Sequence, residues 1–186
     1  MYPQPVTYPD YSNAINTNVL RAWLQVSEDE IDDDLLRELG LRVFSEIERR
    51  TNRVLTEREY RITMDDFFDY WIPIYPFRSI VKVEYWGNDS TMELLGTANY
   101  SVRSKSEYDN TLIFNYNNLP KLGEKWDGGK VVITLKAGYS IESLPKVVLS
   151  AVEHLTRHYY DNKDNPKQEF PSLVDRMIRT FSIDAI

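Results

Sequence analysis

Two histidines are the residues of this sequence whose spacing first suggests chemistry. His154 and His158 lie four positions apart, so on a helix they would share one face and could bind a metal ion. The residues between them are Leu-Thr-Arg, with no glutamate where the zinc-protease motif requires one, and the chain has no cysteine to complete a site. We therefore predict no metal and no cofactor, and interpret both histidines as residues beside the apolar stripe of a helix.

A run of acidic residues is the second candidate site. Between positions 28 and 34, six of the seven residues are carboxylates: Glu28, Asp29, Glu30, Asp32, Asp33 and Asp34. A calcium-binding loop needs a glycine near its middle and a bidentate glutamate at its end, whereas this run has no glycine and a predicted helix begins within it. Ser27 and Glu30 have the spacing of a capping box, and acidic side chains stabilise a helix N-terminus. The run therefore predicts a solvated helix start.

The rest of the sequence shows no recognisable catalytic motif. Residues 127–130, Asp-Gly-Gly-Lys, predict a turn before a strand rather than a phosphate-binding loop before a helix. A carboxylate pair for glycoside cleavage stays open, because distant residues can supply one. The aromatic stretch 67–71 could line a sugar groove, or it could be a packed or subunit-covered edge. We predict that the protein is not an enzyme.

The composition indicates a folded, acidic protein. Of its 186 residues, 42% are hydrophobic and 13% aromatic, which is typical of a globular chain. The formal net charge of −7 argues against a protein that grips nucleic-acid phosphates over a broad surface, although DNA could pass it without being held. No apolar run approaches the ~20 residues of a membrane span, and the first residues lack the order of a secretory signal. We expect a soluble protein, made in the cytoplasm, with no membrane partner.

Hydrophobic periodicity predicts the helices. Apolar residues recur at helical spacing over 31–47 and 145–159, and we expect these two helices to pack against each other as the core. Ser143 is the predicted N-cap of the second helix, and Gly40 within the first should have a packing reason. Shorter helices are expected over 16–26 and 172–179. The predicted apolar stripe of the first long helix is Ile31, Leu35, Leu39, Val43 and Ile47, with Leu36 and Phe44 beside it.

Between the long helices the period changes to two, which predicts strands. Pro73 and Pro76 confine the aromatic stretch 67–75 to an edge or a loop. The other predicted strands cover 57–63, 80–85, 92–95, 100–102, 112–116 and 131–135. These elements predict an extended N-terminal arm over 1–13, helices over 14–53 and 139–165, an inserted β region over 54–138, and a C-terminal arm over 166–186.

Four short motifs accompany this order of elements: Glu48-Arg-Arg-Thr-Asn-Arg-Val-Leu55, Leu135-Lys-Ala-Gly-Tyr139, Leu144-Pro145 and Tyr159-Tyr-Asp-Asn162. Order and motifs together resemble the head–tail connector, or adaptor, proteins of tailed bacteriophages. The likeness covers 20–55 and 131–162, whereas the middle of the chain resembles the family only in being β-rich. It implies an α+β fold: a small antiparallel helical bundle with an inserted antiparallel β region and an extended C-terminal arm.

The resemblance also implies a structural role in the virion neck, at the head–tail junction. Proteins of this family form a ring beneath the portal, implied here to be twelve-fold, which continues the DNA channel and presents a platform to the next protein. The expected partners are therefore the portal protein, a downstream neck or tail protein, further copies of this chain, and DNA that passes without specific binding.

Three sets of residues are candidate sites for that role. Apolar and basic residues of the tail are expected to bind the portal: Arg176, Met177, Arg179, Phe181, Ile183 and Ile186. As an alternative, Phe181 and Ile183 could fold back onto their own helices. Aromatic residues that a small sheet cannot all bury are expected at subunit or downstream contacts: Phe67, Phe68, Tyr70 and Trp71. Acidic residues are expected to line the DNA channel and repel phosphate: Glu28, Asp29, Asp32 and Asp33.

A second class of function stays open beside the connector. The β region could be a binding module that recognises a carbohydrate or a surface protein, such as a baseplate component, with Trp71 in its site. The third hypothesis is that the protein is an enzyme. A monomer that binds glycans through Trp71 would favour the binding module, whereas an oligomer that binds a portal would favour the connector.

Overall fold

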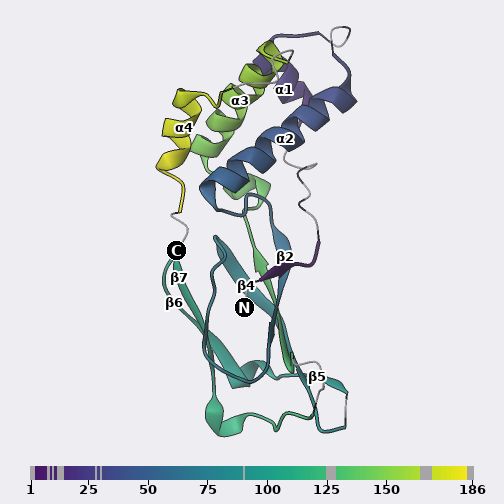
Figure 1. Cartoon of the computed structure of the whole chain (residues 1–186), viewed down its shortest axis with the longest axis vertical. Helices are drawn as coiled ribbons and strands as arrows, with labels where there is room; N and C mark the ends of the chain where they lie inside the picture. Colours follow the sequence, from purple (N-terminus) through teal and green to yellow (C-terminus); the bar gives the residue numbers. More distant parts are fainter. Residues whose placement is uncertain are drawn as a thin grey trace. The chain divides into compact units, whose positions relative to one another are not determined.

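The computed structural model describes residues 3–7, 9, 11, 15–27, 29, 31–89, 91–124, 129–163 and 169–183, and within these the chain divides into two units. The helical unit lies within Pro9–Thr56 and Tyr139–Ile186, and the β unit within Met1–Tyr8 and Glu57–Gly138. Figure 1 shows the helices of the one and the strands of the other. The fold is therefore mixed α+β with an inserted antiparallel β region, as the sequence predicts.

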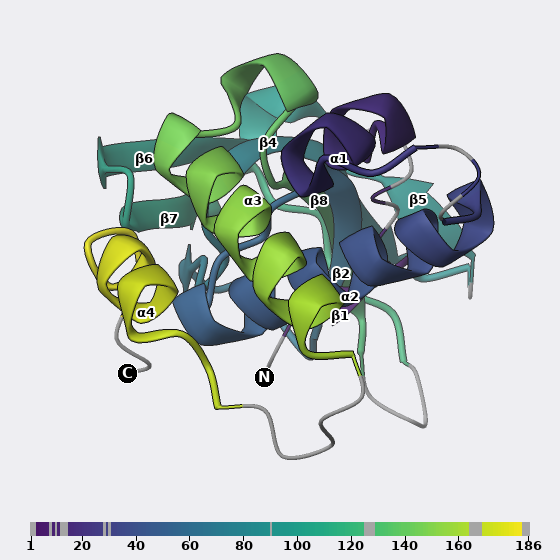
Figure 2. The same cartoon turned by 90° about the horizontal axis from the view of Figure 1, so that it is seen from above.

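The helical unit is built around two long helices. Helix α2 covers Asp33–Thr51 and helix α3 covers Lys146–Asp161, and they pack against each other. Two shorter helices, α1 over Thr17–Leu24 and α4 over Ser172–Arg179, also pack on α3. Figure 2 shows α3 crossing α2, with α1 and α4 on either side of it. The predicted pairing of the long helices is confirmed.

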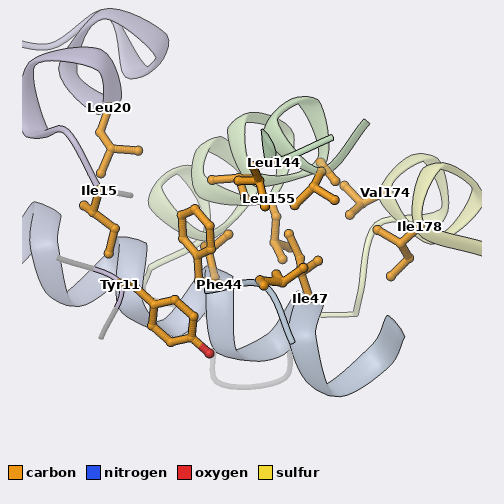
Figure 3. Close-up of a cluster of buried hydrophobic side chains, with 14 of the residues drawn as sticks. Tyr11, Ile15, Leu20, Phe44, Ile47, Leu144, Leu155, Val174 and Ile178 are labelled. Carbon is orange, nitrogen blue, oxygen red and sulfur yellow. The ribbon is translucent and has the colours of Figure 1, made fainter. Parts of the chain in front are cut away.

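The buried side chains of the helical unit come from both ends of the chain. Phe44 and Ile47 of α2 meet Leu155 of α3, and Val174 and Ile178 of α4 close one side (Figure 3). Further members of this core are Tyr11, Ile15, Leu20, Leu36, Val43, Leu144, Val148 and Val152. Burial of each apolar side chain contributes ~1.5–3 kcal/mol to stability. Because its members come from segments more than a hundred residues apart, the cluster holds those segments together.

Helix α2 begins later than the capping box predicts. Its N-cap is Asp32, whose carboxylate accepts the Asp34 amide at 2.9 Å, whereas Glu30 lies outside the described residues. The prediction that Leu35 faces the core is wrong, because its side chain is 55% exposed while Leu36 is buried. Ile31, Val43 and Ile47 of the predicted stripe are buried, and Leu36 and Phe44 complete the buried face in place of Leu35.

Gly40 has the packing reason that the sequence suggested. A Cβ atom built on Gly40 would lie 2.9 Å from Cγ2 of Ile15, closer than carbon atoms pack. The absence of a side chain at this position therefore lets the segment before α1 approach α2.

The N-termini of α1 and α3 are built differently. The side chain of Asn16 caps α1 by accepting the Asn18 amide at 3.0 Å. Helix α3 has Pro145 at its N-cap and no side-chain cap. The prediction that Ser143 caps α3 is wrong, because Ser143 lies in a 3-10 turn, η3 over Ile141–Ser143, and its hydroxyl contacts Ser140 instead.

Within the described residues the β unit holds two antiparallel sheets. The larger has the order β1-β2-β8-β4-β5 and the smaller the order β3-β7-β6. The strands of the larger sheet are β1 Gln4–Pro5, β2 Arg58–Met64, β8 Val131–Ala137, β4 Phe77–Trp86 and β5 Met92–Leu94. Those of the smaller are β3 Tyr70–Trp71, β7 Asp109–Phe114 and β6 Tyr100–Ser106. Every strand predicted between the long helices is present, with boundaries shifted by a few residues. The alternation of apolar and polar residues over 180–186 also predicted a strand, but residues 181–183 form none.

The core of the β unit lies between these sheets. Val83, Ile133 and Leu112 are fully buried, and they come from β4, β8 and β7. The ring of Phe67 packs against Tyr85 of the larger sheet and Phe114 of the smaller, with centroid separations of 6.0 and 5.3 Å. Aromatic contact therefore connects the two layers.

The predicted N-terminal arm is divided between the units. Gln4 and Pro5 form β1 on the edge of β2, and the Val6 amide donates to the Glu59 carbonyl at 2.9 Å, whereas Tyr11 is buried in the helical core. Among the described helices none has both the length and the apolar content required of a membrane span.

Candidate functional site

Both histidines lie on α3, in the helical unit. His154 is exposed on α3, and Nε2 of His158 lies 3.0 Å from the carbonyl oxygen of Glu169. Across the described residues no three His, Asp or Glu side chains gather closely enough to hold a metal ion.

The acidic segment before α2 is exposed and partly structural. Asp29, Asp32 and Asp33 are exposed, and Glu28 lies outside the described residues. Arg21 of α1 donates to the Asp33 carboxylate at 2.7 Å and to the Ile31 carbonyl at 2.7 Å. The hydrogen bond from Arg21 lowers the pKa of Asp33. Asp32 and Asp33 therefore stabilise the start of α2, and their carboxylates remain at the surface.

The aromatic residues predicted for contacts divide between core and surface. Phe67 is buried and Tyr70 half-buried, whereas Phe68 and Trp71 are 41% and 40% exposed. The ring of Trp71 contacts Tyr75 with a centroid separation of 6.2 Å, and Tyr75 contacts Tyr108 at 5.8 Å. We call these three rings, Trp71, Tyr75 and Tyr108, the aromatic row.

Sequence reasoning missed Tyr108 as a member of the aromatic row. It lies in the turn between β6 and β7 and is 44% exposed. Nothing in the local sequence connects it with the stretch 67–75, because strand pairing between β3 and β7 brings them together. Burial raises the pKa of Tyr75, and the charge of Asp109 adds to that effect, so its hydroxyl stays protonated at neutral pH.

The residues predicted to bind a portal also divide. Arg176 is exposed on α4, Met177 is half-buried, and Arg179 donates to the Asp175 carboxylate at 2.8 Å. Phe181 is buried and the Ile183 amide donates to the Thr51 carbonyl at 2.9 Å, so this part of the tail folds back onto its own helices. Ile186 lies outside the described residues.

Arg53 holds the folded-back tail. Its guanidinium is almost completely buried, and Nε donates to the Phe181 carbonyl at 2.6 Å while Nη1 donates to the Tyr139 hydroxyl at 2.8 Å. The same guanidinium lies 4.2 Å from the centroid of the Phe181 ring. A buried charge needs such donors and acceptors, so residues after α2, before α3 and after α4 depend on one another.

A basic groove that sequence reasoning did not predict lies on α2 and α3. Its cavity volume is about 390 Å³, and its lining residues are Arg42, Ser45, Glu46, Arg49, Arg50, Tyr159 and Phe170. We call it the arginine groove. The sequence signal is the spacing of Arg42, Arg49 and Arg50 along α2, but the aromatic wall comes from residues more than a hundred positions later.

Aromatic rings and one carboxylate position the arginines of the groove. The guanidinium of Arg42 lies 4.4 Å from the Tyr159 ring centroid, and that of Arg50 lies 3.7 Å from the Phe170 centroid. Glu46 accepts from Nη2 of Arg49 at 2.8 Å and from Nε of Arg50 at 2.5 Å. Burial favours the protonated form of Glu46, but the hydrogen bonds from Arg49 and Arg50 outweigh it and lower the pKa of this carboxyl.

Comparison with known proteins shows a shared fold. No family profile and no curated protein sequence matches the chain. A chain in the structure described as the neck of an empty gene transfer agent (GTA) particle, computed with C6 symmetry, is 20% identical with a TM-score of 0.75. A chain in the virion of the native GTA particle is 19% identical with a TM-score of 0.76. A chain in the neck of the native particle, computed with C12 symmetry, is 20% identical with a TM-score of 0.68.

Each of these similarities covers 100% of this chain and 97% of the other. At this level of identity the comparison establishes that both units and their order in the chain are shared with those proteins.

Proposed function

We propose that the chain is a structural protein of the neck of a tailed phage or a phage-like particle, where it forms a ring and performs no catalysis. The observation that carries the proposal is the similarity over the whole length of both chains to proteins in GTA necks. Those necks were computed with C6 and C12 symmetry, which supports a repeated arrangement of subunits about one axis. The connector-like motifs at 48–55 and 135–139 independently support the same role.

In this proposal the ring lies between the portal and the next neck or tail protein and continues the DNA channel. Helix α4 provides the portal-facing surface, because Leu173 and Arg176 are exposed on it one turn apart. Phe181 and Ile183 could join that contact only after release from Arg53 and Thr51. The aromatic row supplies contacts to the downstream protein, since exposed aromatic side chains are enriched at interfaces.

The test is binding to heads that carry the portal but lack this chain. Purified protein should sediment with such heads, and the double variant Leu173→Glu/Arg176→Glu should not. Both residues are exposed, so the variant should fold normally. The matched control is Leu94→Glu/Arg61→Glu in the β unit, which should still sediment. Wild-type protein that stays in the supernatant would contradict the proposal.

A second candidate, a carbohydrate-binding module, is favoured by the aromatic row alone. Exposed aromatic rings such as those of Trp71 and Tyr108 are suited to sugar rings as well as to protein. The neck proposal predicts that the purified protein binds no glycan and that Trp71→Ala changes no glycan-binding signal. Glycan binding by a monomer, lost in Trp71→Ala, would support the binding module instead.

A further inference from the structure

We infer that the arginine groove is the docking site for the acidic segment of a second copy of this chain, so that consecutive subunits join head to tail through opposite ends of α2. The inference rests on the proposed ring and names the contact that would build it. Its occupant is the exposed acidic surface at the start of α2, represented by Asp29, Asp32 and Asp34.

The groove is positively charged within an acidic protein. Three arginines and one glutamate line it, so its walls carry two net positive charges, although the chain as a whole carries −7. Arg42 has no carboxylate partner in the part of the chain that the structure describes, and its guanidinium instead stacks on Tyr159. A stacked guanidinium uses its face and leaves the N–H groups in its plane to bind an anion.

The groove is also held in shape before any ligand arrives. Stacking of Arg50 on Phe170 and the contacts of Glu46 with Arg49 and Arg50 limit the rotamers of these side chains. Burial raises the pKa of Tyr159, so its hydroxyl remains a donor at neutral pH. Pre-organised donors bind with a smaller loss of conformational entropy, and arginine pairs with carboxylates in a two-pronged geometry.

The chain itself contains the complementary ligand. The run from position 28 to 34 has six carboxylates in seven residues. It begins α2, and the groove lies on the second half of the same helix, which is 19 residues and therefore about 28 Å long. One subunit cannot bring both ends of a straight helix together, so its own acidic segment does not fill its own groove.

Opposite patches at two ends of one helix favour a heterologous contact. Such a contact, repeated about an axis, closes into a ring when the rotation between neighbouring subunits is a whole fraction of a turn. In this arrangement Asp29 and Asp34 contact the next subunit's groove instead of the DNA channel. Within their own subunit Asp32 is the N-cap of α2, Asp33 accepts from Arg21, and Asp34 accepts from the exposed Arg37 at 3.0 Å.

A charge exchange between two variants tests the inference. The groove variant is Arg42→Glu/Arg49→Glu, and the acid variant is Glu28→Lys/Asp29→Lys/Glu30→Lys/Asp34→Lys. With Asp32 and Asp33 unchanged, the acid variant's run from position 28 to 34 carries a net charge of +2. Each alone places like charges at the contact and should assemble at least about tenfold more weakly than wild type. A mixture of the two should assemble again, because every contact then joins a reversed groove to a reversed acidic end or an original groove to an original end.

Assembly is measured by native mass spectrometry of the full chain at low salt, and on portal-bearing heads if the free protein is monomeric. The matched control, Arg61→Glu/Arg157→Glu, reverses as many charges outside the groove and should assemble like wild type. Thermal unfolding of each variant establishes that it is folded. Restored assembly in the mixture, together with dissociation at high salt, is the expected result.

The outcomes separate this inference from the proposed function. A groove variant that assembles like wild type, or a mixture that shows no recovery, overturns the head-to-tail contact while the ring stands. Wild-type protein that assembles neither alone nor on heads overturns the proposed function as well. Binding of a short DNA duplex that is lost only in the groove variant, with assembly unchanged, would assign the groove to nucleic acid and overturn the inference.

Discussion

The helical unit and the β unit differ in the side chains that they expose. Charge dominates the helical unit, where arginines are held by aromatic rings and carboxylates and the start of α2 is strongly acidic. The β unit presents exposed aromatic side chains, with Trp71 and Tyr108 at the ends of the aromatic row. Charged contacts respond to salt, whereas aromatic contacts depend on buried area. The two units are therefore suited to different neighbours in an assembly.

The units also differ in how the chain builds their cores. The β unit closes mainly through strands from the middle of the sequence, while the helical unit requires α2 to meet helices that begin about a hundred residues later. A substitution in the core of one unit should therefore destabilise mainly that unit, and this difference distinguishes the two cores.

The largest expected effect is the loss of a central core side chain. Leu155→Ala in the helical unit and Ile133→Ala in the β unit should each lower the free energy of unfolding by ~2–5 kcal/mol, because both residues are fully buried. Chemical denaturation measures the loss, and hydrogen exchange shows which unit opens. A loss below ~0.5 kcal/mol at either position would contradict that unit's core.

The next effect concerns the folded-back tail. Arg53→Met should cost ~1.5–3 kcal/mol, because it removes charged hydrogen bonds to the Phe181 carbonyl and the Tyr139 hydroxyl. The amides of Phe181 and Ile183 should exchange faster, while those of the β unit should not. The control Arg157→Met, at an exposed position of α3, should change neither quantity; equal protection of the tail in Arg53→Met would remove Arg53 as its anchor.

Substitutions at three glycines, two in the β unit and one in the helical unit, sharpen the contrast between the units. A Cβ on Gly123 would overlap the Gly87 carbonyl, which is backbone, so Gly123→Ala should cost ~1–3 kcal/mol. A Cβ on Gly96 would lie 3.7 Å from Nδ2 of Asn99, an ordinary contact, so Gly96→Ala should have almost no effect. In the helical unit, Gly40→Ala meets only the side chain of Ile15, and the gain of ~1 kcal/mol in helix propensity offsets part of that clash. Thermal unfolding of the three variants should rank Gly123→Ala as the least stable.

The smallest effect is a pH dependence in the arginine groove. Because the folded-state pKa of Glu46 is below its ordinary value of 4.5, this carboxylate stabilises the fold above that pH, and the stabilisation is lost as the pH falls through the folded-state pKa. Glu46→Gln should therefore lower stability by less than ~1 kcal/mol at pH 7, since solvent screens the pair. The gap to wild type should narrow below pH 4.5; a gap that is independent of pH would contradict the ion pair.

Periodicity predicted the elements of both units because each element carries its own pattern. The burial of Leu36 in place of Leu35 was not predictable in that way, since the two residues are adjacent and equally apolar. Pattern also could not show that Arg53 binds the Phe181 carbonyl, because that contact joins residues 128 positions apart.

The candidate sites follow the same division. The acidic surface could be predicted because its residues are close together in the sequence. Those of its residues that the structure describes are exposed. The arginine groove and the aromatic row were missed as sites because tertiary packing, between α2 and α3 and between β3 and β7, assembles each of them. The predicted contacts with portal, downstream protein and DNA stay predictions.

Imaging the neck of a particle shows whether this chain forms a ring there. Electron cryomicroscopy should compare particles made with the wild-type chain and particles made without it. We expect a closed ring at the end of the head, with subunit density that fits both units of this structure. In particles made without the chain, the ring should be missing and the tails unattached. A complete neck in particles that lack the chain would contradict the account.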